Sequence, residues 1–211
     1  MLSNKNTIIF DFDGTLADTM QIFTDVASSL ISEHYGMDKC EARKMYLKTS
    51  GFPFYQQLEI IFPGNEKNKI VAPIYEEQKL FATSDVELED GALEALKQLK
   101  EVNYNLVISS NNFQYNIDKF IDNNNLHSIF DLALGFKDGF AKGRNHFDFT
   151  IKELGLEKDK IVFIGDSLND YFLANAENID FIGKVGTFKE DDFKALNNEI
   201  PIIKKISNLI I

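Results

Sequence analysis

IIFDFDGT, residues 8–15, is the stretch of this sequence that decides the fold. It opens with residues 8–10, a short run of branched and aromatic side chains that predicts a buried β-strand. Asp11 and Asp13 follow, and two carboxylates two residues apart at a strand end project to the same side. Gly14 then allows the backbone to turn sharply. Because neighbouring carboxylates repel each other, the pair predicts a bound cation or a shared proton.

Further strand-like runs follow, separated by segments with helical spacing. This alternation predicts a doubly wound α/β domain with a mainly parallel sheet and helices on both faces. One helix is expected after an Asp90 cap, another over residues 147–154 before Gly155, and a third after Asp166. In such sheets, ligands bind beyond the carboxyl ends of the strands. The expected strands span residues 104–109, 130–134, 160–164, 180–182 and 201–203.

The segment 17–85 interrupts this alternation and predicts an all-helical cap inserted after the first strand. Apolar spacing over residues 22–31 fits one long helix, and Asp38 is expected to cap the next. Glycine and proline at 51–53 and 62–64 separate further helical stretches. The expected domains are therefore an α/β core of residues 1–16 and 86–211 and a helical cap of residues 17–85.

The composition is ordinary for a globular protein, but the charge is one-sided. Of the 211 residues, 44% are hydrophobic and 26% are charged, and the formal net charge is −11. That balance argues against a nucleic-acid backbone or an anionic membrane as the main partner, because both attract clustered Lys and Arg.

The cysteine content and the first residues of the sequence indicate in which cellular compartment the protein is expected. Cys40 is the only cysteine, which excludes an intrachain disulfide and a cysteine metal cluster, and we expect it to be a small buried or neutral residue. Residues 1–6 are too few and too polar for a signal peptide, and no run approaches the roughly 18 apolar residues of a membrane span. We therefore expect a cytoplasmic protein.

Four polar signals follow the expected strands in order. They are DFDGT at 11–15, SSNN at 109–112, Lys142 within GFAKG at 139–143, and GDSLND at 165–170. Each alone has an ordinary interpretation as a strand end, a turn, a solvated lysine or a helix cap. Together they supply carboxylates, a hydroxyl and an ammonium group at one edge of the sheet. This donor set is suited to Mg²⁺ and a phosphate group.

On these motifs, the chain resembles the haloacid dehalogenase superfamily, specifically its phosphatase branch with a helical cap after the first strand. The resemblance covers nearly the whole chain and includes phosphoglycolate phosphatase-like and β-phosphoglucomutase-like enzymes. It implies a Rossmann-like core and a Mg²⁺-dependent hydrolase of a small soluble phosphomonoester. Asp11 would attack phosphorus and form an aspartyl-phosphate. Asp13 would protonate the leaving alcohol and later accept a proton from water.

The resemblance also implies how phosphate and metal are held. Ser109, the amide of Ser110 and Lys142 would bind the phosphate oxygens. The lysine motif departs from the Lys-Pro-x-Pro of many relatives, because Gly143 follows Lys142. Thr15 and Asn111 would support the site from a greater distance. Metal ligands would be Asp11, the backbone carbonyl of Asp13, Asp166 and Asp170, the last directly or through water.

Two alternatives stay open beside the phosphatase. The first is a β-phosphoglucomutase-like phosphosugar mutase, which shares Asp13. A dehalogenase is a different case: its reaction needs no acid for an alcohol leaving group, so the presence of Asp13 argues against a dehalogenase. The second is a non-catalytic binding protein of the same fold, which would have no chemical need for Asp11, Asp13, Lys142 and Asp166 together.

Other candidates carry less weight. His146 follows Lys142 closely, but we expect it at the surface or at a helix start. Residues 183–187 contain two glycines and predict a turn after a strand. In similar enzymes a loop of the cap selects the leaving group, so residues 48–54 are expected to set specificity. The expected protein is a monomer or homodimer that acts on a small phosphorylated metabolite.

Overall fold

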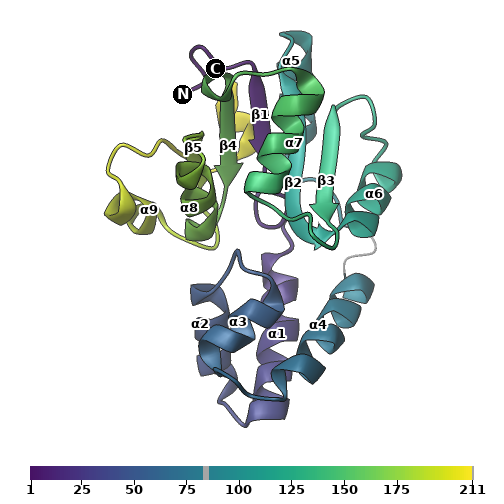
Figure 1. Cartoon of the computed structure of the whole chain (residues 1–211), viewed down its shortest axis with the longest axis vertical. Helices are drawn as coiled ribbons and strands as arrows, with labels where there is room; N and C mark the ends of the chain where they lie inside the picture. The colour runs from purple at the N-terminus through teal and green to yellow at the C-terminus, as the bar shows by residue number, and fades with distance from the viewer. Residues whose placement is uncertain (83–85, 211) are drawn as a thin grey trace. The chain divides into compact units, whose positions relative to one another are not determined.

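The computed structural model describes residues 1–82 and 86–210 and divides the chain into two compact units (Figure 1). The core unit consists of Met1–Asp18 with Glu87–Ile211, and the helical unit is Thr19–Val86. The sequence places the boundaries after residues 16 and 85. Residue 85 lies outside the described residues, and this division of domains stays a prediction.

The core unit is built on a parallel sheet, in which the described residues form six strands. They are β1 (Thr7–Phe10), β2 (Asn105–Phe113), β3 (Leu132–Phe136), β4 (Ile161–Gly165), β5 (Asp180–Lys184) and β6 (Ile202–Ile203). Their order is β3-β2-β1-β4-β5-β6, and every neighbouring pair is parallel. The chain therefore winds outward in one direction from β1 and in the other from β4. The predicted doubly wound α/β fold is confirmed.

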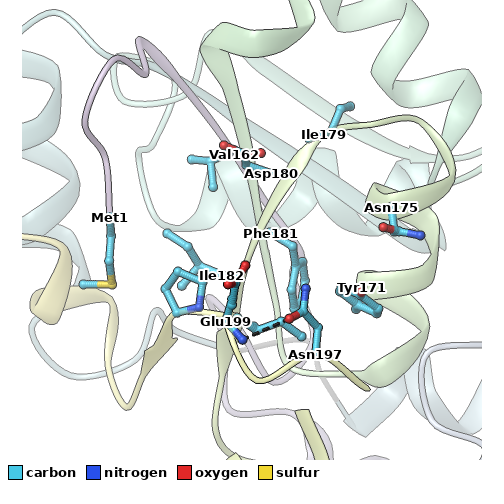
Figure 2. A pocket seen from close by; sticks show the side chains of 12 residues that line it. Met1, Val162, Tyr171, Asn175, Ile179, Asp180, Phe181, Ile182, Asn197 and Glu199 are labelled. Atoms are coloured by element: carbon cyan, nitrogen blue, oxygen red, sulfur yellow. Dashed lines mark hydrogen bonds between the residues drawn. The ribbon is translucent and has the colours of Figure 1, made fainter. Parts of the chain in front are cut away.

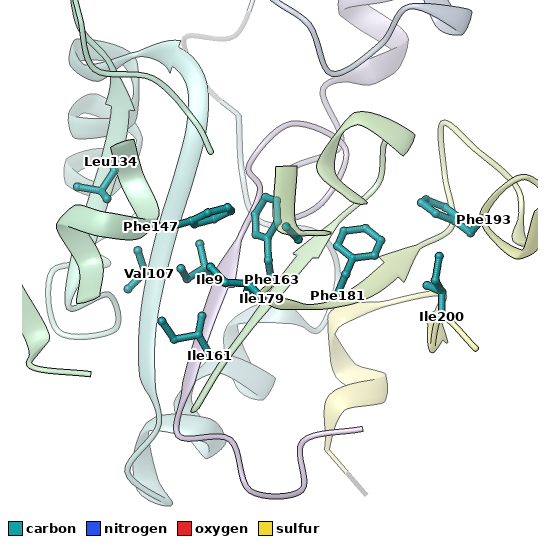
Figure 3. Packing of buried hydrophobic residues seen from close by; sticks show 11 residues of the cluster. Ile9, Val107, Leu134, Phe147, Ile161, Phe163, Ile179, Phe181, Phe193 and Ile200 are labelled. Atoms are coloured by element: carbon teal, nitrogen blue, oxygen red, sulfur yellow. The ribbon is translucent and has the colours of Figure 1, made fainter. Parts of the chain in front are cut away.

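Helices cover both faces of this sheet, because alternate strand residues point to opposite sides. Figure 3 shows the apolar layer on one face, where Ile9, Val107 and Phe163 of three neighbouring strands lie near Phe147 of a covering helix. Phe193 of another helix packs farther along the layer, beside Phe181. The rings of Phe147 and Phe163 meet edge to face, with centroids 5.2 Å apart. Each fully buried side chain of this size stabilises the fold by about 1.5–3 kcal/mol. The helices of this face are α7 (Arg144–Leu154), α8 (Leu168–Ala176) and α9 (Glu190–Leu196).

The opposite face buries the intervening strand residues. Ile8 and Leu106 are fully buried there. Helix α5 (Ala92–Glu101) contacts β2, and α6 (Gln114–Asn123) contacts β2 and β3. Short 3-10 helices complete the unit at η1 (Lys158–Lys160) and η2 (Ile206–Leu209), the second against α5.

The helical unit has a core of its own, rich in aromatic rings. Its helices are α1 (Met20–Tyr35), α2 (Lys39–Lys48), α3 (Phe54–Ile61) and α4 (Asn68–Ala82). Phe54 stacks on Tyr75 at 3.9 Å, and the Tyr75 hydroxyl shares a hydrogen bond of 2.8 Å with that of Tyr46. Asp38 caps α2 as predicted, by accepting hydrogen bonds from two backbone amides. None of the helices described in residues 1–82 and 86–210 is both long and apolar enough for a membrane crossing.

Three local expectations are wrong in whole or in part. Asp90 does not cap α5, because Gly91 takes the cap position with a φ of +79° and no side-chain hydrogen bond. Helix α7 begins at Arg144, three residues before the expected start, although it ends at Gly155 as expected. Cys40 is exposed in the first turn of α2 rather than buried.

Candidate active site

Three buried carboxylates meet where the winding of the sheet reverses. Asp11 directly follows β1, Asp166 follows β4, and Asp170 lies in the first turn of α8. None of the three is more than 4% exposed. Each offers one oxygen atom, and these oxygens lie within 4.8 Å of one another. The structure thus brings together three of the four expected metal ligands.

The turn after β1 is built by short-range backbone hydrogen bonds. The amide of Asp11 still donates to the Ile164 carbonyl at 2.8 Å, which continues the pairing of β1 with β4. Three residues later the chain reverses at Gly14, whose φ of +78° is in the left-handed region that favours glycine. The Gly14 amide donates to the Ala17 carbonyl at 2.8 Å and closes the turn. Asp11 and Asp13 are therefore held on a rigid corner.

Asp170 is held by a capping box at the start of α8. Its Oδ2 accepts hydrogen bonds from the Ser167 hydroxyl at 2.7 Å and the Ser167 amide at 3.1 Å. The Asp170 amide in turn donates to Ser167 Oγ at 3.2 Å. This reciprocal pair explains the Gly-Asp-Ser-x-x-Asp spacing: the helix cap itself aims the second aspartate at the first.

Gly165 leaves space for Asp170, and Gly165→Ala should disrupt both the site and the fold. A Cβ at position 165 would lie 2.5 Å from Asp170 Oδ2 and 2.6 Å from its Cβ. We expect a loss of about 1–3 kcal/mol in the free energy of unfolding, and a loss of phosphate release, because the carboxylate must move. Denaturant unfolding and a phosphate-release assay measure the two effects. Gly186→Ala is the matched control, since its Cβ would meet its nearest neighbour at 3.9 Å; equal stability of the two variants would contradict this prediction.

Lys142 is the buried ammonium group of this cluster. Its Nζ lies 2.8 Å from Asp11 Oδ1 and 2.7 Å from Asp170 Oδ1. The expectation that Lys142 sits at a strand end is wrong, because β3 ends at Phe136 and Lys142 occupies the loop before α7. The Lys142 amide donates to Asn111 Oδ1 at 3.3 Å, which ties this loop to β2.

The charges of the cluster do not balance. Burial raises the pKa of Asp11 well above its usual value; Lys142 opposes this shift, and Asp170 and Asp166 add to it. Burial, followed by the charge of Asp170, raises the pKa of Asp166 to about 7. Burial alone would lower the pKa of Lys142, but Asp11 and Asp170 outweigh it and the pKa is raised. Three oxygen-bearing acids around one ammonium group fit a hard divalent cation.

The sequence predicts Ser109 at the end of a strand, but Ser109 lies inside β2. The strand continues to Phe113, and its register with β3 shifts between these two residues. Ser109 Oγ lies 2.9 Å from Nδ1 of His146. His146 is fully buried in the first turn of α7, so the expected surface position is wrong and the expected helix start is right.

Four residues for which the sequence predicts no role in the site contribute to it. Asn112 donates through Nδ2 to Asp13 Oδ2 at 2.8 Å, and its own amide donates to Ser110 Oγ at 2.9 Å. The hydroxyl of Thr187 donates to Asp166 Oδ2. Lys184 and Glu89 form the remaining pair: Lys184 Nζ donates to the Gly14 carbonyl at 3.0 Å and lies 3.0 Å from Glu89 Oε2.

A signal for two of these residues was present in the sequence. Lys184 and Thr187 stand at the carboxyl end of β5, in the segment 183–187 that was expected to be only a turn. The strand-end rule that selected Asp11 and Asp166 applies equally to β5, since it neighbours β4. The expectation of a turn is partly wrong, because β5 includes Gly183 and Lys184.

A cavity of about 310 Å³ lies elsewhere in the core unit (Figure 2). Its lining includes Tyr171, Asn175, Asp180 and Asn197, from α8, β5 and the segment before β6. Val162 and Asp180 place it near the amino ends of β4 and β5, whereas the carboxylates gather at the carboxyl ends. We therefore assign the site to the carboxylate cluster.

Comparisons with known proteins agree with this geometry. A family model described as haloacid dehalogenase-like hydrolase matches residues 8–184. The chain is 24% identical to the "Probable phosphatase IndB" of Dickeya dadantii over 98% of this chain and 92% of that protein. It is 26% identical to the pyrophosphatase PpaX of Listeria innocua over 85% of this chain and 83% of that protein. A haloacid dehalogenase-like family hydrolase of Streptococcus pneumoniae has the same fold, with a TM-score of 0.82 at 20% identity over 99% of this chain and 98% of that one.

Proposed function

We propose a function from the premise that the chain belongs to the haloacid dehalogenase-like hydrolase family and is a phosphatase of that family. In this proposal it hydrolyses a small soluble phosphomonoester through an aspartyl-phosphate, with Mg²⁺ as cofactor. The observation that carries the proposal is the buried cluster of Asp11, Asp166 and Asp170 around Lys142. Burying such a cluster carries a desolvation penalty that lowers the stability of the fold unless a cation and an anionic ligand bind there.

Asp11 is the nucleophile in this proposal. One of its carboxylate oxygens forms a bond to phosphorus while the bond from phosphorus to the leaving alcohol breaks. The contact of Lys142 with Oδ1 fixes the carboxylate and partly neutralises it. A rigid nucleophile needs little reorganisation when the phosphate arrives.

Asp13 is the acid and base. It donates a proton to the leaving oxygen, and later takes one from the water that attacks the aspartyl-phosphate and releases inorganic phosphate. The hydrogen bond from Asn112 Nδ2 holds one carboxylate oxygen of Asp13 at 2.8 Å and so orients the carboxylate.

The remaining groups hold charge. The phosphate oxygens are bound by the Ser109 hydroxyl, the Ser110 amide and the Lys142 ammonium. Mg²⁺, when bound, reduces the repulsion between the phosphate and the attacking carboxylate. Its proposed ligands are Asp11, the backbone carbonyl of Asp13, Asp166 and Asp170, and the fit rests on three oxygens within 4.8 Å.

Phosphate release from a panel of substrates tests this proposal. The panel includes para-nitrophenyl phosphate, phosphoglycolate, pyrophosphate, nucleotides and sugar phosphates, since relatives are named pyrophosphatase and phosphoglycolate phosphatase. We expect release that requires Mg²⁺ and stops with a chelator. Absence of release on the whole panel would overturn the phosphatase. Interconversion of sugar phosphates faster than phosphate release would assign the chain to the mutases.

A further inference from the structure

His146 is a buried titratable group to which the proposed mechanism gives no role. It is fully buried in the first turn of α7, and its Nδ1 lies 2.9 Å from Ser109 Oγ. The Phe140 ring packs against the imidazole with centroids 4.5 Å apart. The next residue, Phe147, is fully buried in the apolar layer, so the position of the imidazole is set by the packing of α7 on the sheet.

The imidazole is neutral at physiological pH. Burial lowers the pKa of His146 to about 3, and the positive charge of Lys142 acts in the same direction. To a smaller extent, the nearby Gly135 backbone raises the pKa of His146 and the charge of Lys137 lowers it. A neutral ring carries one proton, so Nδ1 either donates to Ser109 or accepts from it.

We infer that His146 carries its proton on Nδ1 and donates it to Ser109 Oγ, which turns the hydroxyl proton of Ser109 toward the phosphate. This inference rests on the proposed function, in which Ser109 binds a phosphate oxygen. His146 is thus a positioning residue that acts through Ser109.

The first argument concerns the other ring nitrogen. Nε2 of His146 is buried and has no hydrogen-bond partner within the described part of the chain. A proton on Nε2 would be a buried donor without an acceptor, and such N–H groups are rarer than unsatisfied acceptors. The proton is therefore better placed on Nδ1, where Ser109 Oγ accepts it.

The second argument concerns the hydroxyl. A serine hydroxyl has one proton and two lone pairs. If it donated to His146, only lone pairs would face a phosphate oxygen, and these would repel it. If it accepts from His146, its own proton is left for the phosphate, and the lone pair facing the ring is already used.

Two nearly isosteric variants test this arrangement. His146→Asn keeps an amide donor close to the position of Nδ1, whereas His146→Leu has none. We expect His146→Leu to lower kcat/KM about tenfold, the value of one hydrogen bond, and His146→Asn to retain most of the activity. Equal losses in the two variants would overturn the inference. Thermal unfolding of both variants separates this effect from a loss of folded protein.

A double-mutant cycle with Ser109→Ala tests whether His146 acts through Ser109. In the Ser109→Ala background, His146→Leu should cause no further loss of kcat/KM. A tenfold loss in that background as well would show that His146 does not act through Ser109 and would overturn the inference. If the wild type hydrolyses nothing on the panel, the proposed function fails, and the tautomer is then decided by the next measurement.

Nitrogen-15 NMR of the imidazole gives a readout independent of turnover. The wild type, with the His146→Asn spectrum for assignment, should show a protonated Nδ1 and an unprotonated Nε2 across neutral pH. A proton on Nε2, or a ring that becomes charged near neutral pH, would overturn the inference whatever the enzyme hydrolyses.

Discussion

Asp11→Asn should lower turnover on the best substrate by on the order of 10³-fold or more, because it removes the nucleophile while keeping its size. A carboxamide does not attack phosphorus. The substitution also removes one of the carboxylates within 4.8 Å of one another and weakens the contact with Lys142, 2.8 Å away. Steady-state phosphate release with Mg²⁺ measures the effect.

Asp118→Asn is the matched control for this variant. Asp118 is an exposed aspartate on α6, so the same chemical change there should leave turnover unaltered. Both proteins should be folded like the wild type, which circular dichroism would measure. An Asp11→Asn protein with the wild-type rate would contradict the aspartyl-phosphate mechanism.

Mg²⁺ should raise the unfolding temperature, and the rise should be larger at about pH 8 than at about pH 5.5. The pKa of Asp166 is about 7 in the folded chain and 3.8 ordinarily. Between pH 3.8 and about 7, Asp166 keeps a proton in the folded state that it has lost in the unfolded state. The free energy of unfolding of the metal-free protein therefore falls as pH rises through this range and then levels off. A protonated Asp166 is a poor metal ligand, so Mg²⁺ stabilises the protein most on the alkaline side.

The size of this effect follows from mass action. At 100 times its Kd, Mg²⁺ should contribute about 2.7 kcal/mol, which for a chain of this size corresponds to about 5–10 °C. Differential scanning calorimetry at the two pH values measures it. Asp166→Asn should weaken the fall in stability with pH, to which Asp11 also contributes, and should lose the response to Mg²⁺. An unchanged response in that variant, or a larger one at acid pH, would contradict the prediction.

The residues predicted best from sequence are those fixed by local rules. Asp11 and Asp166 follow apolar runs that become neighbouring strands, and pairing of β1 with β4 brings them together. Asp170 follows from the helix cap at Ser167, a contact over three residues. The strand-end rule and the capping rule are both visible in a short window of sequence.

The residues predicted poorly depend on contacts that no local pattern encodes. Lys142 reaches Asp11 from a loop, across 131 positions of the chain. His146 meets Ser109 across 37 positions of the chain, through the packing of α7 on the sheet. Asn112 lies in the stretch where the register of β2 with β3 shifts, and such irregularities come from tertiary packing.

The insertion of the helical unit after β1 has a consequence for how the chain folds. Phe10 pairs with Ile108 on one side and with Ile164 on the other, so the central strand of the sheet finds both of its partners far along the chain.

During synthesis β1 is made before the other strands and stays unpaired until β2 follows. The carboxylate cluster cannot assemble until residue 170 has been made. Closing such long loops slows folding far more than it lowers stability. The helical unit, a compact unit of residues 19–86, can form earlier and shorten the loop that β1 must close. Apolar β1 is then the strand that stays longest without its partners.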